Sequence, residues 1–148
     1  MNAPPTLEKL SYASRSFRAA LDQVPTEVWA TSYIDNFPHG ACGHVSELVG
    51  RYLSDQFSIE PEYVCGTLYD GEGNRLSSHA WLEWNGVTID ISADQFGWPP
   101  VIVSDCSTYH ANIEIEERHG LNEDIAWWGQ YCARIWNSAM GFLAHPIR

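Results

Sequence analysis

The dipeptide Asn85-Gly86 constrains the fold more than any other feature of this sequence. It lies between two runs, 78–84 and 87–92, that are rich in β-branched and aromatic residues. Asn-Gly favours the two-residue type I′ turn, because both central residues of that turn need a positive φ angle. We therefore predict an antiparallel hairpin in which the last residue of the first run faces the first residue of the second.

The rest of the chain predicts helices on either side of this hairpin in the sequence. Apolar residues recur at helical spacing over 6–22, from residue 41 or 42 to 55, and over 122–143, and Thr6 is a candidate cap of the first helix. Further strands are predicted over 62–69 and 101–103. This order of elements predicts an α+β class, with helices packed on a small, mostly antiparallel sheet.

Length and charge narrow the possible functions. With 148 residues the chain has the size of one domain, so we expect residues 1–148 to form a single unit. The formal net charge is -11, which repels phosphate backbones and anionic lipids, so we expect neither nucleic-acid nor membrane binding. No apolar run approaches the ~20 residues of a membrane span. Because the N-terminal residues also lack a secretory apolar region, we expect a cytoplasmic protein.

Cys42 differs from the other cysteines because it is predicted to open a helix. Unpaired N–H groups at a helix start favour ionisation of a thiol and can bind an oxyanion. Gly40 and Gly43 keep side chains away from a substrate carbonyl at this position. The alternative is a buried structural cysteine beside a glycine-rich cap. The remaining cysteines, which form no CxxC pair, are Cys65, Cys106 and Cys132.

The register of the hairpin places His79 and Asp90 on one face of the sheet. Counting back from the turn, His79 faces Ser92, so Asp90 is its diagonal neighbour at ~7–8 Å between Cα atoms. A carboxylate in that position can orient the imidazole and stabilise its protonated form. A register slip of one residue would move Asp90 to the opposite face. The alternative interpretation is a hairpin with an ordinary polar face.

In its motifs the chain resembles the transglutaminase-like, papain-like superfamily of cysteine hydrolases and acyl transferases. The resemblance spans roughly residues 35–96 and depends on three segments, Gly40-Ala41-Cys42-Gly43, His79-Ala80-Trp81-Leu82-Glu83 and Ile89-Asp90. It implies that Cys42 attacks an acyl carbonyl, that His79 takes the thiol proton and later protonates the leaving group, and that Asp90 fixes the tautomer of His79. The chain is too short for the β-sandwich domains and calcium sites of animal transglutaminases.

Three further residues are candidates to support this site. Asn36 lies six positions before Cys42, a spacing that papain-like enzymes use for an oxyanion-hole amide; the alternative is a turn before Pro38. Gln95 is expected either to line the cleft or to pack the loop after the hairpin. Trp81 is expected to wall an apolar groove or to lie in the core. No HExxH or comparable pair occurs, so we expect neither a metal nor a cofactor.

The resemblance implies a cysteine-dependent hydrolase or acyl transferase with an acyl-enzyme intermediate. Its substrate would be a peptide, a protein or a small acyl compound, cleaved at an amide of the backbone or of a Gln side chain, or at a related acyl bond. Two alternatives stay open at this point. One is a catalytically inactive module of the same fold that binds a peptide or partner, and the other is an effector or toxin that deamidates glutamine.

Overall fold

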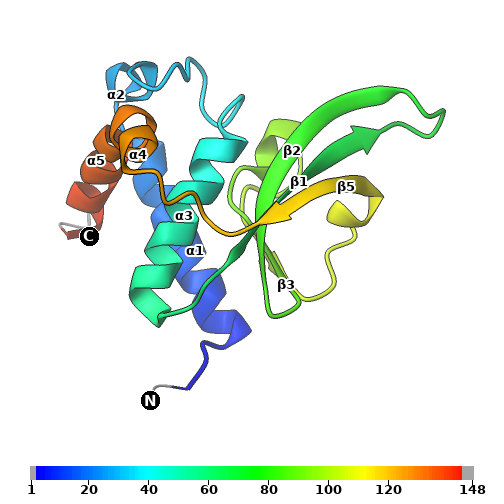
Figure 1. Cartoon of the computed structure of the whole chain (residues 1–148), viewed down its shortest axis with the longest axis horizontal. Coiled ribbons are helices and arrows are strands. Elements are labelled where there is room, and N and C mark those ends of the chain that lie inside the picture. Colours follow the sequence, from blue (N-terminus) through cyan, green and yellow to red (C-terminus); the bar gives the residue numbers. More distant parts are fainter. Residues whose placement is uncertain (1–2, 145–148) are drawn as a thin grey trace.

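The computed structural model describes residues 3–144, in which a group of helices packs against a five-stranded sheet (Figure 1). The helices are α1 (Leu7–Gln23), α2 (Thr26–Ala30), α3 (Cys42–Phe57), α4 (Ile125–Tyr131) and α5 (Ala133–Ala144). The strands are β1 (Glu62–Tyr69), β2 (Arg75–Trp84), β3 (Val87–Asp90), β4 (Ile102–Ser104) and β5 (Ile113–His119). Two short 3-10 helices, η1 (Ala93–Phe96) and η2 (His110–Asn112), precede β4 and β5.

The first two predicted helices are present, and the last one differs from the prediction. Thr6 caps α1 by accepting a hydrogen bond from the backbone N–H of Lys9 at 3.2 Å. The single helix expected over 122–143 is two helices, because the backbone of Cys132 leaves helical geometry at φ -121° while its side chain is buried in the core. Within residues 3–144, no helix has the length and apolar character needed to cross a bilayer.

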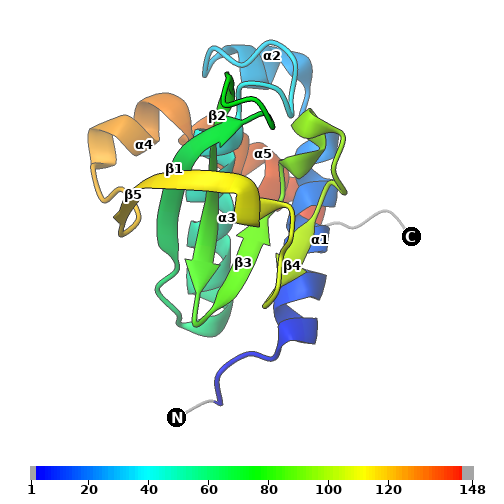
Figure 2. The same ribbon diagram turned by 90° about the vertical axis from the view of Figure 1, so that its right-hand side faces the viewer.

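The sheet has the strand order β4-β3-β2-β1-β5, and every neighbouring pair is antiparallel. The predicted hairpin is confirmed, since Trp84 pairs with Val87, and Asn85 and Gly86 have φ angles of 48° and 77°. Figure 2 shows the sheet in front of α3, with β5 crossing at its edge. Neither α2 nor β5 is evident from the sequence, and β5 is exposed beyond Ile113, so no apolar pattern marks it.

Apolar side chains pack on both faces of the central strand β2. Leu82 faces the helices and joins the main core of α1, α3 and α5. Trp81, the preceding residue, points to the opposite face and packs with Val64 and Ile113 in a second cluster. Because both faces are covered, polar side chains on this part of β2 are buried and need partners within the protein.

Candidate active site

The three residues predicted as a triad come from three different elements that meet at one end of the sheet. Cys42 is the first residue of α3, His79 lies within β2, and Asp90 is the last residue of β3. The Nε2 atom of His79 lies 2.6 Å from Oδ2 of Asp90, and both side chains are buried. The structure therefore brings His79 and Asp90 onto one face, as the hairpin register predicts.

Three hydrogen-bond donors hold the carboxylate of Asp90. The backbone N–H of Ser92 donates to Oδ1 at 3.0 Å, while His79 and His110 both bond to Oδ2. Burial raises the pKa of Asp90, but the bonds to His110 and His79 and their charges outweigh it and lower this pKa to about 2. Asp90 is consequently an ionised acceptor at neutral pH.

The thiol of Cys42 lies beside His79 at the start of α3. Ala41, the residue before the helix, provides no side-chain cap, so the first N–H groups of the helix have no capping acceptor. Burial raises the pKa of Cys42, but the His79 imidazole, the Ala80 backbone and Gln95 together lower it below the ordinary thiol value. The local environment thus favours a thiolate, the nucleophilic form of cysteine.

His79 contacts the Asp90 carboxylate and interacts with the Cys42 thiol. Nε2 faces Asp90, and the other nitrogen, Nδ1, lies on the opposite side of the ring, 2.7 Å from the amide nitrogen of Gln95. Burial lowers the pKa of His79, but its hydrogen bonds to Asp90 and Cys42 and their charges raise it to about 9. A raised imidazole pKa beside a lowered thiol pKa is the electrostatic pattern of a thiolate–imidazolium pair.

Gln95 reaches this ring because a buried arginine holds η1 in place. Arg18 of α1 donates to the backbone carbonyl of Ile91 at 2.8 Å and to both carboxylate oxygens of Asp94 at 2.8 Å. These bonds tie the segment after β3 to α1. Gln95 was one of the candidates from the sequence, whereas Arg18 was not, although an arginine among the apolar positions of an amphipathic helix is a signal of a buried partner.

Trp81 and Asn36 lie in different surroundings from Gln95. Trp81 is 1% exposed, and its ring stacks on that of His79 at a centroid distance of 5.9 Å, so it supports the imidazole from within the core. Asn36 is exposed, and its backbone carbonyl accepts a hydrogen bond from the His39 N–H at 2.7 Å. The side chain of Asn36 makes no hydrogen bond within residues 3–144, and its role in an oxyanion hole stays a prediction.

His110 was not predicted, and it brings a second imidazole to Asp90. His79, Asp90 and His110 offer three metal-ligating atoms within 4.8 Å of one another. The two ring nitrogens lie 2.6 and 2.8 Å from the same oxygen, closer than the about 3.3 Å between two ligands of a tetrahedral ion. The observed spacing is that of hydrogen bonds, and the expectation of a site without metal stays a prediction.

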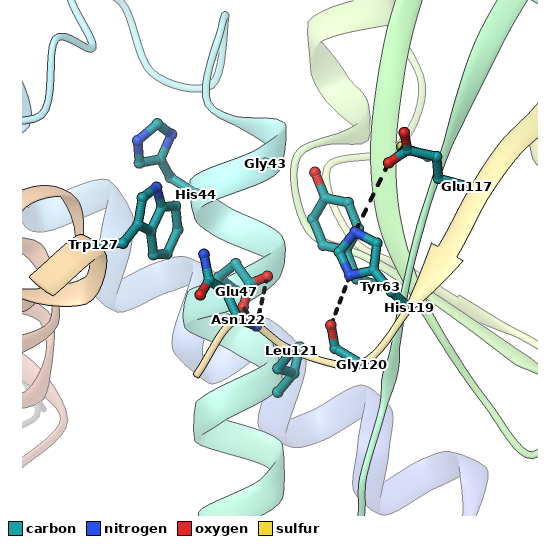
Figure 3. Close-up of a pocket in the computed structure, with 11 residues that line it drawn as sticks. Gly43, His44, Glu47, Tyr63, Glu117, His119, Gly120, Leu121, Asn122 and Trp127 are labelled. Atoms are coloured by element: carbon teal, nitrogen blue, oxygen red, sulfur yellow. Dashed lines mark hydrogen bonds and ion pairs between the residues drawn. The ribbon is translucent and has the colours of Figure 1, made fainter. Parts of the chain in front are cut away.

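A cavity of about 510 Å³ is lined by Gly43, the residue after Cys42, and by residues of α3, β1, β5 and α4 (Figure 3). Tyr63 and Trp127 contribute aromatic walls, and Glu47 and Glu117 contribute carboxylates. A Cβ atom on Gly43 would lie 3.3 Å from the Tyr63 hydroxyl, so glycine keeps this junction open. Gly40 has open space around it and adopts a positive φ of 71°, a conformation that glycine favours.

Comparisons of the chain with protein-family models, with curated proteins and with solved structures found no match.

Proposed function

We propose that this protein is a cysteine-dependent hydrolase or acyl transferase of the transglutaminase-like, papain-like fold. The observation that carries the proposal is the position of His79, which is bonded through Nε2 to Asp90 and also interacts with the Cys42 thiol. Nucleophile, base and orienting carboxylate are the parts that covalent acyl transfer requires. The motif resemblance in the sequence supports the same assignment.

The proposed reaction has two halves. The Cys42 thiolate attacks the carbonyl carbon of an amide, ester or thioester, and a C–S bond forms while the oxygen becomes an oxyanion. We expect the N–H groups at the start of α3, which have no side-chain cap, to stabilise that charge. Collapse then breaks the bond to the leaving group, which takes its proton from the His79 imidazolium.

In the second half, water or an amine attacks the acyl-enzyme. His79, now neutral, accepts a proton from the attacking molecule, and the C–S bond breaks to release the acid or the new amide. The cavity lined by Gly43 is the proposed site for the acyl part of the substrate, because Gly43 directly follows Cys42 at the start of α3. Peptides, proteins and small acyl compounds are the substrate classes that this chemistry serves.

The first test compares the cysteines of one molecule. Each thiol is alkylated with iodoacetamide at neutral pH, and the rates are followed by mass spectrometry of the peptides. We expect Cys42 to react on the order of tenfold faster than the exposed Cys106, because its thiolate is stabilised. Cys65, whose pKa burial and Glu117 raise, is a matched slow control beside the same cavity.

The second test uses p-nitrophenyl acetate as an acyl donor. Release of nitrophenolate should accompany an acetyl group on Cys42, and Cys42→Ala should abolish both. Full turnover in a folded Cys42→Ala variant would contradict the proposal. Equal alkylation of Cys42 and Cys106 in the native protein would instead favour the inactive binding module.

A further inference from the structure

The Oδ2 atom of Asp90 is shared by two imidazoles. His79 Nε2 lies 2.6 Å away, and His110 Nε2 lies 2.8 Å away. The other oxygen of Asp90 is taken by the Ser92 N–H. A triad needs one of these imidazoles, so the second, which is contributed by η2 before β5, requires an explanation.

The hydrogen bonds around His110 determine where its proton lies. Asp90 is ionised and can only accept, so Nε2 of His110 must carry the hydrogen. In the neutral ring Nδ1 is then an acceptor, and the hydroxyl of Ser107, which lies 2.6 Å away, donates to it. Ser107, His110 and Asp90 thus form a directed chain of hydrogen bonds that ends on the carboxylate.

The ring of His110 is held in this orientation by its surroundings. The residue is 6% exposed, and its ring packs against Trp81 and Trp98 at centroid distances of 5.0 and 5.6 Å. The titratable groups that face it are Asp90 from β3 and His79 from β2, whose ring centroid is 6.2 Å away. A second donor on Asp90 is therefore a fixed part of this site.

We propose that His110 is a positioning residue for the reaction of Cys42 and His79, an inference that rests on the proposed function. During turnover His79 gains and loses a proton, while the buried carboxylate of Asp90 stays charged. When His79 is neutral, the N–H of His110 still stabilises that charge. By sharing the negative charge, His110 also limits how tightly Asp90 holds the imidazolium, so that His79 releases its proton to the leaving group.

Two variants separate this role from a purely structural one. His110→Phe keeps a ring in the aromatic pocket and removes the donor, whereas His110→Gln keeps an N–H donor for Asp90. The readouts are the pH dependence of Cys42 alkylation by iodoacetamide and the turnover of p-nitrophenyl acetate. In His110→Phe we expect turnover to fall on the order of tenfold. The acid limb of the alkylation profile, which is the rise of the Cys42 alkylation rate as the thiol ionises, should move to lower pH. His110→Gln should restore most of the turnover.

The possible outcomes separate the role of His110 from the proposed function of Cys42 and His79. Wild-type turnover and an unshifted pH profile in both variants would overturn the role of His110 while leaving the triad intact. A parallel loss of alkylation and turnover in His110→Phe, with the acid limb moved to higher pH, would also overturn it. If Cys42 of the unmodified protein shows no enhanced alkylation, the proposed function fails and this role fails with it.

A spectroscopic measurement on the unmodified protein needs no variant to fold. In protein labelled with ¹⁵N-histidine, two-bond correlations report which ring nitrogen carries the hydrogen. We expect His110 in the Nε2–H form near neutral pH. The Nδ1–H form would place an acceptor opposite the Asp90 carboxylate and would overturn the inference.

Discussion

Replacing Asp90 by asparagine tests the site at its most buried point. The substitution keeps the shape of the side chain and removes its charge. The asparagine oxygen can still accept from His79 and His110 at the former Oδ2 position, but its NH2 group then faces the N–H of Ser92. Two donors facing each other leave both unsatisfied, which costs about 1–3 kcal/mol in the free energy of unfolding.

The larger effect of Asp90→Asn is on the thiol. The pKa of His79 is raised from 6.5 to about 9 against the opposing effect of burial, a difference of about 3 kcal/mol at ~1.4 kcal/mol per unit. Without the carboxylate, burial dominates and the imidazole is neutral at pH 7. Cys42 then loses its cationic partner, and its pKa rises to the ordinary value near ~8.5 or above. Only about 3% of the thiol is ionised at pH 7 at that pKa, so alkylation at pH 7 should slow, by at most about 30-fold.

The assay is the rate of Cys42 alkylation between pH 5 and pH 10, measured for both proteins. The acid limb of the variant should move to higher pH, and the two rates should converge at high pH where every accessible thiol is ionised. Glu114→Gln, an exposed carboxylate on β5, is the matched control and should leave the profile unchanged. An Asp90→Asn variant that is folded and alkylates at pH 7 as fast as wild type would refute the electrostatic argument.

Two further predictions concern stability. Gly66→Ala should lower the free energy of unfolding by about 2 kcal/mol or more in urea titrations. The new Cβ atom would overlap the carbonyl oxygen of Glu114 and lie 2.8 Å from its carbonyl carbon. The control is Gly71→Ala, where the Cβ atom meets open space and the free energy of unfolding should change by less than about 0.5 kcal/mol. Stability should also fall at both ends of the pH range. The pKa of Asp90 is lowered to about 2, so its contribution to stability is fully present above pH ~4 and is lost as the pH falls toward about 2. The pKa of His79 is raised to about 9, so its contribution to stability is fully present below pH ~6.5. That contribution is lost as the pH rises through about 9. Thermal midpoints that stay constant from pH 6 to pH 10 would contradict the assignment of His79.

Much of the local structure follows from short stretches of the chain. The Asn85-Gly86 turn needs no distant contact, and the alternation of a strand then sets which side chains share a face. The pairing of His79 with Asp90, which are eleven positions apart, could therefore be predicted from the short segment that contains both. The position of Cys42 at a helix start follows in the same way from helical periodicity after a glycine-containing loop.

Other features could not be predicted from the sequence, because no local pattern of residues encodes them. In the exposed edge strand β5 only Ile113 is buried, so no apolar pattern marks this strand in the sequence. The break at Cys132 depends on how α4 and α5 pack on the other helices. The cavity beside Gly43 is likewise formed by α3, β5 and α4 together, which are far apart in the chain.

The sequence by itself determined the hairpin, the α+β class and the pairing of a histidine with an aspartate, because turn chemistry and side-chain periodicity act over a few residues. Only the tertiary structure decided which distant groups complete the site. Arg18 reaches Asp94 across 76 positions, and His110 reaches Asp90 from a separate loop. Such contacts depend on how layers pack and on the need of each buried polar group for a partner, and neither condition is written in any single segment.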